Sequence, residues 1–106
     1  MAWTVGFLAD DVAAALTDLP VDIRAKFERI VRLIQTHGLE RVREPYVKHL
    51  EGPVWEMRMI GRDGIARAAY VTASGQRVVV VHVFQKTQKT PRREIEAALR
   101  RAKEVT

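Results

Sequence analysis

Charged side chains alternate with apolar ones in the middle of the chain, at a spacing that strands would place on one face. Glu56 and Arg58 are two residues apart in one such segment, so a strand directs both to the same side. Arg67 lies in the next segment and His82 in a third, which Lys86 follows directly. Cations held by rigid strands form a preorganised pocket for a phosphodiester.

The chemistry that such a pocket favours is the internal cleavage of RNA. That reaction needs a base for the 2′-hydroxyl, cations for the phosphorane-like transition state and a proton donor for the leaving 5′-oxygen. The candidates are Glu56 or His82 as the base, Arg58 and Arg67 as phosphate clamps, and Lys86 or Lys89 as the donor or electrostatic stabiliser. A structural interpretation stays open, because Arg58 and Glu56 also fit a cross-strand ion pair and His82 fits a satisfied core histidine.

The third of these segments organises the C-terminal half. Its β-branched run, residues 78–81, predicts a strand that is packed on both faces, or a central strand with one crowded face. A loop with Lys86 and Lys89 follows, so a core strand delivers cations to the surface. Thr90 then predicts a helix N-cap, and Pro91 the first position of the last helix.

The remaining elements follow from periodicity and turn signals. Apolar residues recur at helical spacing between Pro20 and Gly38, and Asp10 or Asp11 is expected to cap a shorter helix before it. The predicted order is a strand over 4–8, helices over 13–16 and 20–37, an irregular connector over 39–53, strands over 54–60, 65–72 and 76–85, and a helix over 91–105. This order indicates an α+β fold: an N-terminal strand and two helices, then a three-strand antiparallel meander that completes a twisted sheet, with the helices on one face.

Length and composition narrow the class of protein. The 106 residues predict one domain, 1–106, and the absence of cysteine excludes disulfides and thiolate metal sites. His37, His49 and His82 lie on different predicted elements, so we expect no metal and no cofactor. No apolar run is long enough for a bilayer and no signal peptide is evident, so we expect a cytoplasmic protein without a membrane partner.

Charge is distributed unevenly along the chain. Residues 1–53 carry seven Lys or Arg against eight Asp or Glu, whereas residues 54–106 carry eleven against five. Such an excess fits either a polyanionic partner, with nucleic acid first among them, or a basic surface that is simply solvated. The candidate RNA-binding residues are Lys48, Lys89, Arg92 and Arg93. Tyr70 is a candidate base-stacking ring, although its aromatic ring also fits core packing.

Four segments together resemble a known family. They are WEMR at 55–58, the GIxRxxY pattern at 64–70, HVFQKTQKTP at 82–91 and the tail PxxEIxxALRRxKE at 91–104. The chain resembles the phage-related, HigB-type branch of the RelE/ParE toxin superfamily. The resemblance implies a RelE-like fold and a type II toxin that cuts mRNA on the ribosome without a metal.

The resemblance also assigns roles to residues. It implies an active-site cation at Arg58, an arginine on the scissile phosphate at Arg67 and a further cation at Lys86. Two departures are that Glu56 stands where RelE has a lysine and that a C-terminal tyrosine is missing, so the acid and base are not transferred. Under these roles, Arg67→Ala is expected to relieve growth arrest while the protein still accumulates folded.

Partners and rival functions follow from the same resemblance. The expected partners are a cognate antitoxin with a helix-turn-helix domain, which masks either the pocket or the N-terminal helices, and mRNA on the ribosome; operator DNA is contacted only through the antitoxin. The first rival is a ParE-like inhibitor of DNA gyrase, a protein inhibitor with the same fold. The second is an RNA-binding domain without catalysis.

Overall fold

The computed structural model describes residues 3–62, 64–85 and 90–105. Its elements, in chain order, are β1 (Thr4–Phe7), α1 (Asp10–Thr17), α2 (Val21–His37), the short 3₁₀ helix η1 (Leu39–Arg41), β2 (Val47–Glu51), β3 (Val54–Gly61), β4 (Gly64–Ala73), β5 (Arg77–Gln85) and α3 (Arg92–Ala102). None of the helices in the described part of the chain is long and apolar enough to cross a membrane.

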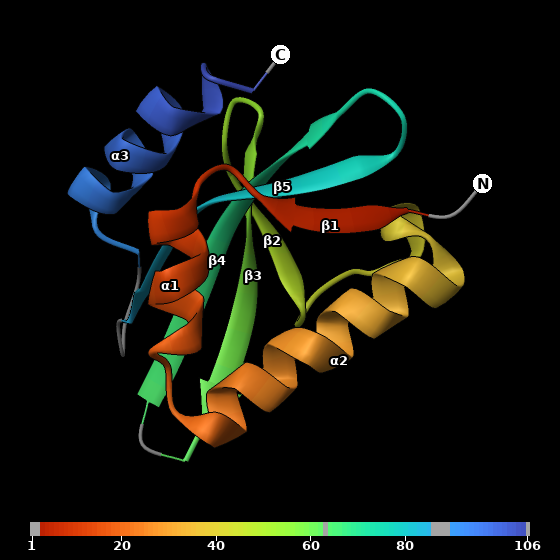
Figure 1. Ribbon diagram of the computed structural model, residues 1–106, viewed down its shortest axis with the longest axis vertical. Coiled ribbons are helices and arrows are strands. Elements are labelled where there is room, and N and C mark those ends of the chain that lie inside the picture. Colours follow the sequence, from red (N-terminus) through yellow and green to blue (C-terminus); the bar gives the residue numbers. More distant parts are fainter. Residues whose placement is uncertain (1–2, 63, 86–89, 106) are drawn as a thin grey trace.

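A single five-stranded sheet runs through the molecule in the order β1-β5-β4-β3-β2 (Figure 1). The strands β2 to β5 pair antiparallel, and β1 pairs parallel with β5. The predicted meander of three strands is therefore confirmed as β3-β4-β5. β5 lies between β1 and β4, which explains why residues 78–81 are all buried and why its sequence is a continuous β-branched run.

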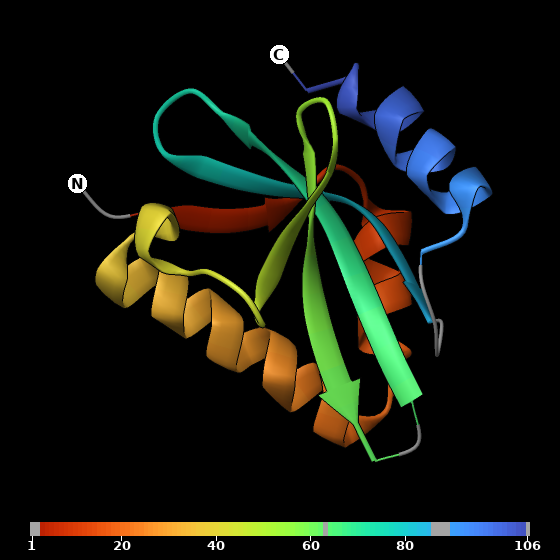
Figure 2. The same ribbon diagram turned by 180° about the vertical axis from the view of Figure 1, so that it is seen from behind.

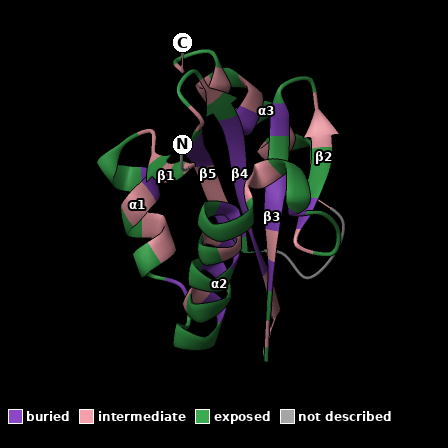
Figure 3. Cartoon of the chain, turned by 90° about the vertical axis from the view of Figure 1, so that its right-hand side faces the viewer, coloured by how far each residue is buried: buried purple, intermediate pink, exposed green. Residues whose placement is uncertain are grey.

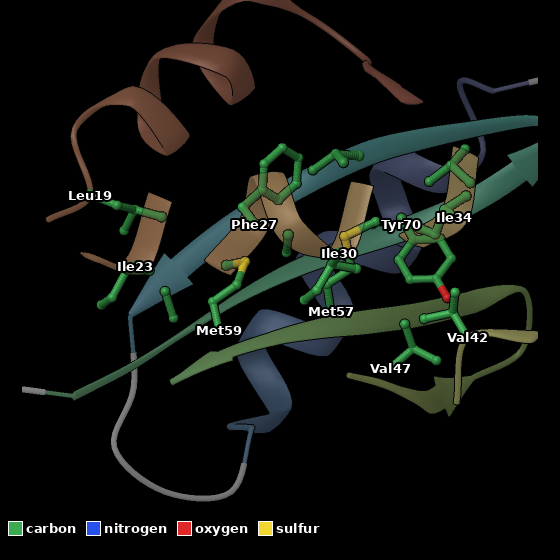
Figure 4. Close-up of a cluster of buried hydrophobic side chains, with 14 of the residues drawn as sticks. Leu19, Ile23, Phe27, Ile30, Ile34, Val42, Val47, Met57, Met59 and Tyr70 are labelled. Atoms are coloured by element: carbon green, nitrogen blue, oxygen red, sulfur yellow. The ribbon is translucent and has the colours of Figure 1, made fainter. Parts of the chain in front are cut away.

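One face of the sheet packs on α2. Four residues at helical spacing, Ile23, Phe27, Ile30 and Ile34, are all buried against it. Figure 4 shows them opposite Met57, Met59 and Tyr70 from β3 and β4. Gly38, with a φ of 89°, ends the helix as its C-cap, as the sequence predicts.

The other face packs on α3, so the prediction that all helices cover one face is wrong. Ala98 of α3 is fully buried against a second cluster that includes Val54, Val71 and Val81. The alternation of strand residues supplies both clusters, and the views from opposite sides show α2 and α3 at separate places on the sheet (Figures 1 and 2). Figure 3 shows the buried residues gathered in the central strands, with exposed residues on the outer surfaces of the helices.

A further strand, β2, lies in the segment that the sequence indicates as an irregular connector. Val47 pairs with Met57 and is buried, but Lys48 and His49 are exposed because β2 is the edge strand. A register shift between His49 and Glu51 interrupts the pairing. This short edge strand has one buried residue at its start and therefore no clear alternation to reveal it.

The helix starts differ from the predicted capping. α1 has Ala9 at its N-cap without a side-chain hydrogen bond, and Asp10 and Asp11 lie in its first turn, where carboxylates stabilise the helix dipole. Pro20 and Pro91 are N-cap residues, so each lies one position before the first residue of its helix. The sequence predicts instead that each proline is the first helical residue. Both prolines still fit these places, because they lack an N–H.

Gly61 at the end of β3 is expected to be intolerant of a side chain. A Cβ there would overlap the side chain of Ile23 and lie 2.8 Å from Asp22 Oδ2. We predict that Gly61→Ala lowers the free energy of unfolding by about 1–3 kcal/mol, since overpacking forces the start of α2 away from the sheet. Urea unfolding measures the change. Gly6→Ala is the matched control, because nothing lies within 4 Å of a Cβ at that strand position; equal midpoints for the two variants would contradict the prediction.

Candidate active site

Strand register brings the predicted polar residues together on the α3 face of the sheet. Arg58 of β3 lies directly opposite Arg67 of β4, and Arg67 in turn lies opposite Phe84 of β5. Glu56 precedes Arg58 by two residues and shares its face, while His82 bears the same relation to Phe84. Three neighbouring strands thus contribute to one polar cluster, as the sequence predicts.

The centre of this cluster is a closed ring of hydrogen bonds between three side chains. Arg67 Nη1 donates to Glu56 Oε2 at 2.7 Å and to Thr90 Oγ1 at 2.8 Å. Thr90 Oγ1 donates to Glu56 Oε1 at 2.8 Å. Glu56 is fully buried and Arg67 is 5% exposed. The charge of Arg67 thereby compensates the charge of the buried carboxylate, and β3, β4 and the chain entering α3 are joined at one point.

Arg58 differs from Arg67 in its environment. Its side chain is 29% exposed, and its Nε lies 4.0 Å from Glu56 Oε2. The guanidinium makes no hydrogen bond to the described residues, although its Nε is buried. Because Glu56 already binds Arg67 and Thr90, Arg58 is a cation of this cluster whose donors, as far as the described residues go, remain available to a ligand.

His82 is held by the first turn of α3. Its Nε2 lies 2.8 Å from Glu94 Oε1, and both side chains are slightly exposed. The imidazole stacks on the ring of Phe84, with centroids 5.2 Å apart. A carboxylate accepts hydrogen bonds only, so this contact fixes the ring through Nε2–H.

The other predicted RNA-binding residues are scattered. Lys48 is exposed and pairs in register with Glu56, and Arg93 is exposed on α3. Tyr70 is 2% exposed in the core on the α2 face, so the base-stacking prediction for its ring is wrong, and burial raises the pKa of its hydroxyl. Lys86 and Lys89 lie outside the described residues.

Arg92 is occupied by acidic neighbours. It forms a two-pronged ion pair with Glu51 of β2, in which Nη2 and Oε2 are 3.0 Å apart, and a further pair with Glu96. The hydrogen bond from Arg92 lowers the pKa of Glu51, and the same bond raises the pKa of Arg92. This arginine therefore ties α3 to the sheet edge, which leaves it less available to RNA than the sequence suggests.

Two members of the cluster have no counterpart among the predicted site residues. Thr90 is predicted as a helix cap, yet its hydroxyl binds Glu56 and Arg67 and caps nothing. Glu94 carries no signal beyond its place three residues after Pro91, in the first helical turn. Their roles depend on how α3 docks on the sheet, which local patterns do not encode.

Two further observations bound the chemistry. Within the described ranges, no group of three or more His, Asp or Glu side chains is arranged to hold a metal ion. A large apolar hollow lies on the α2 face, lined by residues that include Trp3, Val42 and Trp55, and the polar cluster is not part of it. The polar cluster is therefore the candidate active site.

Comparison with known proteins gives a family and a fold. Residues 14–103 match the family described as Phage derived protein Gp49-like. None of the curated proteins matches the chain. A chain of the archaeal RelE–RelB complex from Pyrococcus horikoshii OT3 is similar at a TM-score of 0.59 and 19% identity, over 84% of this chain and 100% of that one. A mutant of the E. coli toxin RelE in the free state is similar at 0.64 and 17%, over the whole of both chains.

These matches agree with the resemblance that the four sequence segments carry. The family match spans most of the chain, and the similarity to the E. coli toxin extends over its full length. At this level of identity the solved structures establish the fold and leave the activity to be argued from the residues. The chain belongs to the phage-derived Gp49-like family, and its fold is that of the RelE toxins.

Proposed function

We propose that this protein is the toxin of a toxin–antitoxin pair and that it cleaves mRNA on the ribosome. The observation that carries the proposal is the contrast between its two central arginines. Arg67 is buried and bound to Glu56 and Thr90, whereas Arg58 is partly exposed on a rigid strand with no hydrogen bond to the described residues. A fixed cation with available donors suits a phosphate whose charge rises in the transition state.

The proposed reaction is transfer of the phosphoryl group within the RNA. The 2′-oxygen attacks the adjacent phosphorus, the bond from phosphorus to the 5′-oxygen breaks, and the products are a 2′,3′-cyclic phosphate and a 5′-hydroxyl. Arg58 binds the non-bridging oxygens of the phosphate. His82, with Nε2–H donated to Glu94, keeps Nδ1 as the acceptor for the 2′-hydroxyl proton. Lys86, outside the described residues, remains the proposed donor to the 5′-oxygen.

Glu56 takes a different role from the one expected of it as a base. Its carboxylate is fully buried and accepts hydrogen bonds from Arg67 and Thr90, so a substrate hydroxyl has no route to it in this structure. We propose that Glu56 and Arg67 act as positioning residues, which hold β3 and β4 in the register that presents Arg58.

The proposed partner is a cognate antitoxin. The archaeal RelE chain with this fold was crystallised in a complex with RelB, which supports such a partner here. The net charge of +5 is concentrated in the second half of the chain and favours an acidic partner surface. We propose a helix-turn-helix antitoxin, which also provides the only contact with operator DNA, and a cytoplasmic site of action where mRNA is translated.

Inducible expression in bacteria tests the proposed activity against gyrase inhibition. We expect growth arrest with new 5′ ends inside translated mRNAs, because cleavage on the ribosome follows the reading frame, and no induction of the DNA-damage response. Sequencing of 5′ ends and a damage-response reporter measure the two. Intact mRNA together with a strong damage response would establish a gyrase inhibitor in place of a nuclease, and intact mRNA without that response would indicate RNA binding alone.

A further inference from the structure

A basic cleft borders Arg58 along the free edge of β3. Its volume is about 320 Å³, and its lining includes Lys26 and Arg29 of α2, Tyr46, and Arg58 and Ile60 of β3. Arg58 thus belongs both to the polar cluster and to this cleft. Neither the sequence motifs nor the family match singles out Lys26, Arg29 or Tyr46.

The cleft exists because β2 is shorter than β3. Val47, the first residue of β2, pairs with Met57. Beyond this pair, the contact among the described residues continues through the hydrogen bond from Arg58 N–H to the Tyr46 carbonyl, 2.9 Å. The last residues of β3 therefore pair with β4 alone. The N-terminal half of α2 lies beside this end of β3 in both views (Figures 1 and 2). Lys26 and Arg29, three residues apart, lie on one side of that helix.

The charge of the cleft is of one sign. Three of its lining residues are cations and none is acidic. Among the described residues, neither Lys26 nor Arg29 forms an ion pair, and both are exposed. The nearest carboxylate on the same stripe of α2 is Asp22, which accepts the backbone N–H of Arg62 at 2.7 Å.

The apolar members of the cleft fit a nucleic acid better than a simple anion. Tyr46 is half-buried at its wall, and Ile60 is 54% exposed although it is a large aliphatic residue. A groove that combines cations with an aromatic ring and exposed apolar surface is typical of single-stranded nucleic-acid binding, where phosphates meet the cations and bases stack.

We propose that this cleft binds single-stranded RNA next to the phosphate that Arg58 contacts, with Lys26 and Arg29 on the backbone and Tyr46 against a base. The proposal rests on the proposed function for its choice of RNA. It gives the bound RNA a path over the protein. The RNA passes from the polar cluster across the free edge of β3 and continues along α2. It also explains why α2, on the opposite side of the sheet from α3, carries beside Arg58 two cations that form no ion pair with the described residues.

Fluorescence anisotropy with a single-stranded RNA that carries 2′-O-methyl groups tests the cleft without cleavage. We expect the double variant Lys26→Glu/Arg29→Glu to bind at least tenfold more weakly than the unaltered protein. For Lys26→Ala/Arg29→Ala, the slope of log K against log salt is expected to fall by about 1.4, since each phosphate contact to a single strand contributes about 0.7.

The matched control is Arg100→Glu/Lys103→Glu, which makes the same change of net charge at exposed positions near the C-terminal end of the chain. Affinity that falls equally in the cleft variant and in this control would overturn the proposal, because general charge would then explain it. Thermal melting checks that each variant is folded. If the cleft variant unfolds, cross-linking of the unaltered protein to 4-thiouridine RNA decides: cross-links at Tyr46 or Lys26 uphold the cleft, and cross-links only elsewhere overturn it.

The outcomes separate this cleft from the nuclease activity. If the unaltered protein leaves mRNA intact, and the Lys26/Arg29 variant binds RNA more weakly than it, the cleft is upheld and the proposed reaction is not. A protein that cuts mRNA but binds RNA equally well in that variant has the reaction without the cleft. Binding of the antitoxin alone at these residues, with no effect on RNA, would also overturn the proposal.

Discussion

Replacing Glu56 with alanine is expected to lower the free energy of unfolding by about 3–5 kcal/mol, the usual range for removing one partner of a buried ion pair. The variant leaves the 5% exposed guanidinium of Arg67 without the carboxylate that it contacts at 2.7 Å, and Thr90 loses its acceptor. Native domains are stable by only about 5–15 kcal/mol, so a loss of this size removes much of the folded population.

Urea unfolding of the purified protein measures this change. The matched control is Glu96→Ala, which removes a carboxylate from the exposed ion pair with Arg92 and is expected to leave the midpoint nearly unchanged. A double-mutant cycle with Arg67→Met and Glu56→Met separates pairing from burial, because the apolar pair together should destabilise less than the sum of the single variants. A Glu56→Ala midpoint equal to that of Glu96→Ala would contradict a structural role for the ring.

This prediction changes the meaning of variants at Arg67. From sequence, Arg67→Ala is expected to abolish toxicity while the protein accumulates folded. In the structure the same change leaves the buried carboxylate of Glu56 without its ion-pair partner, so loss of toxicity and loss of stability are expected together. Both a phosphate clamp and a positioning residue therefore predict the same phenotype for Arg67→Ala.

Arg58→Ala is expected to reduce the rate of mRNA cleavage by about 10²–10³-fold, the usual effect of removing one preorganised group that stabilises transition-state charge. Stability should change little, because Glu56 keeps its hydrogen bonds from Arg67 and Thr90 when Arg58 is removed. The separation of activity from stability is what distinguishes Arg58 from Arg67.

Single-turnover cleavage of a translated mRNA, together with urea unfolding of the same preparations, measures both quantities. Arg58→Lys keeps the charge but lacks the planar fork of donors, so it is expected to recover part of the rate. Arg100→Ala is the control for the loss of an exposed arginine outside the cluster. Unaltered cleavage by a folded Arg58→Ala variant would remove Arg58 from the active site.

The alternation of residues along strands predicted which side chains share a face. Because side chains alternate strictly, Glu56, Arg58 and Arg67 could be placed together from the sequence once a tight hairpin joined β3 to β4. Helical periodicity identified the apolar side of α2, where four residues at that spacing are buried. Both features depend on residues that are close in sequence, so the sequence pattern is enough to predict them.

The features that the sequence does not predict depend on how helices and strands pack against one another. The buried Arg67 binds Thr90, which lies 23 residues later, just before a helix that packs on the sheet through Ala98. β2 is an edge strand whose exposed Lys48 and His49 hide its period. The cleft at Arg58 arises from the unequal lengths of β2 and β3 and from the path of α2, three features that are distant in sequence.

The most direct test is cleavage by the purified protein in a reconstituted translation reaction. An mRNA is placed on ribosomes with an empty A site, the protein is added, and primer extension maps the 5′ ends, with free mRNA and the Arg58→Ala variant run in parallel. We predict cuts within the A-site codon that require the ribosome and fall by at least a hundredfold in the variant. Intact ribosome-bound mRNA after incubation with the folded, unaltered protein would contradict the proposed function.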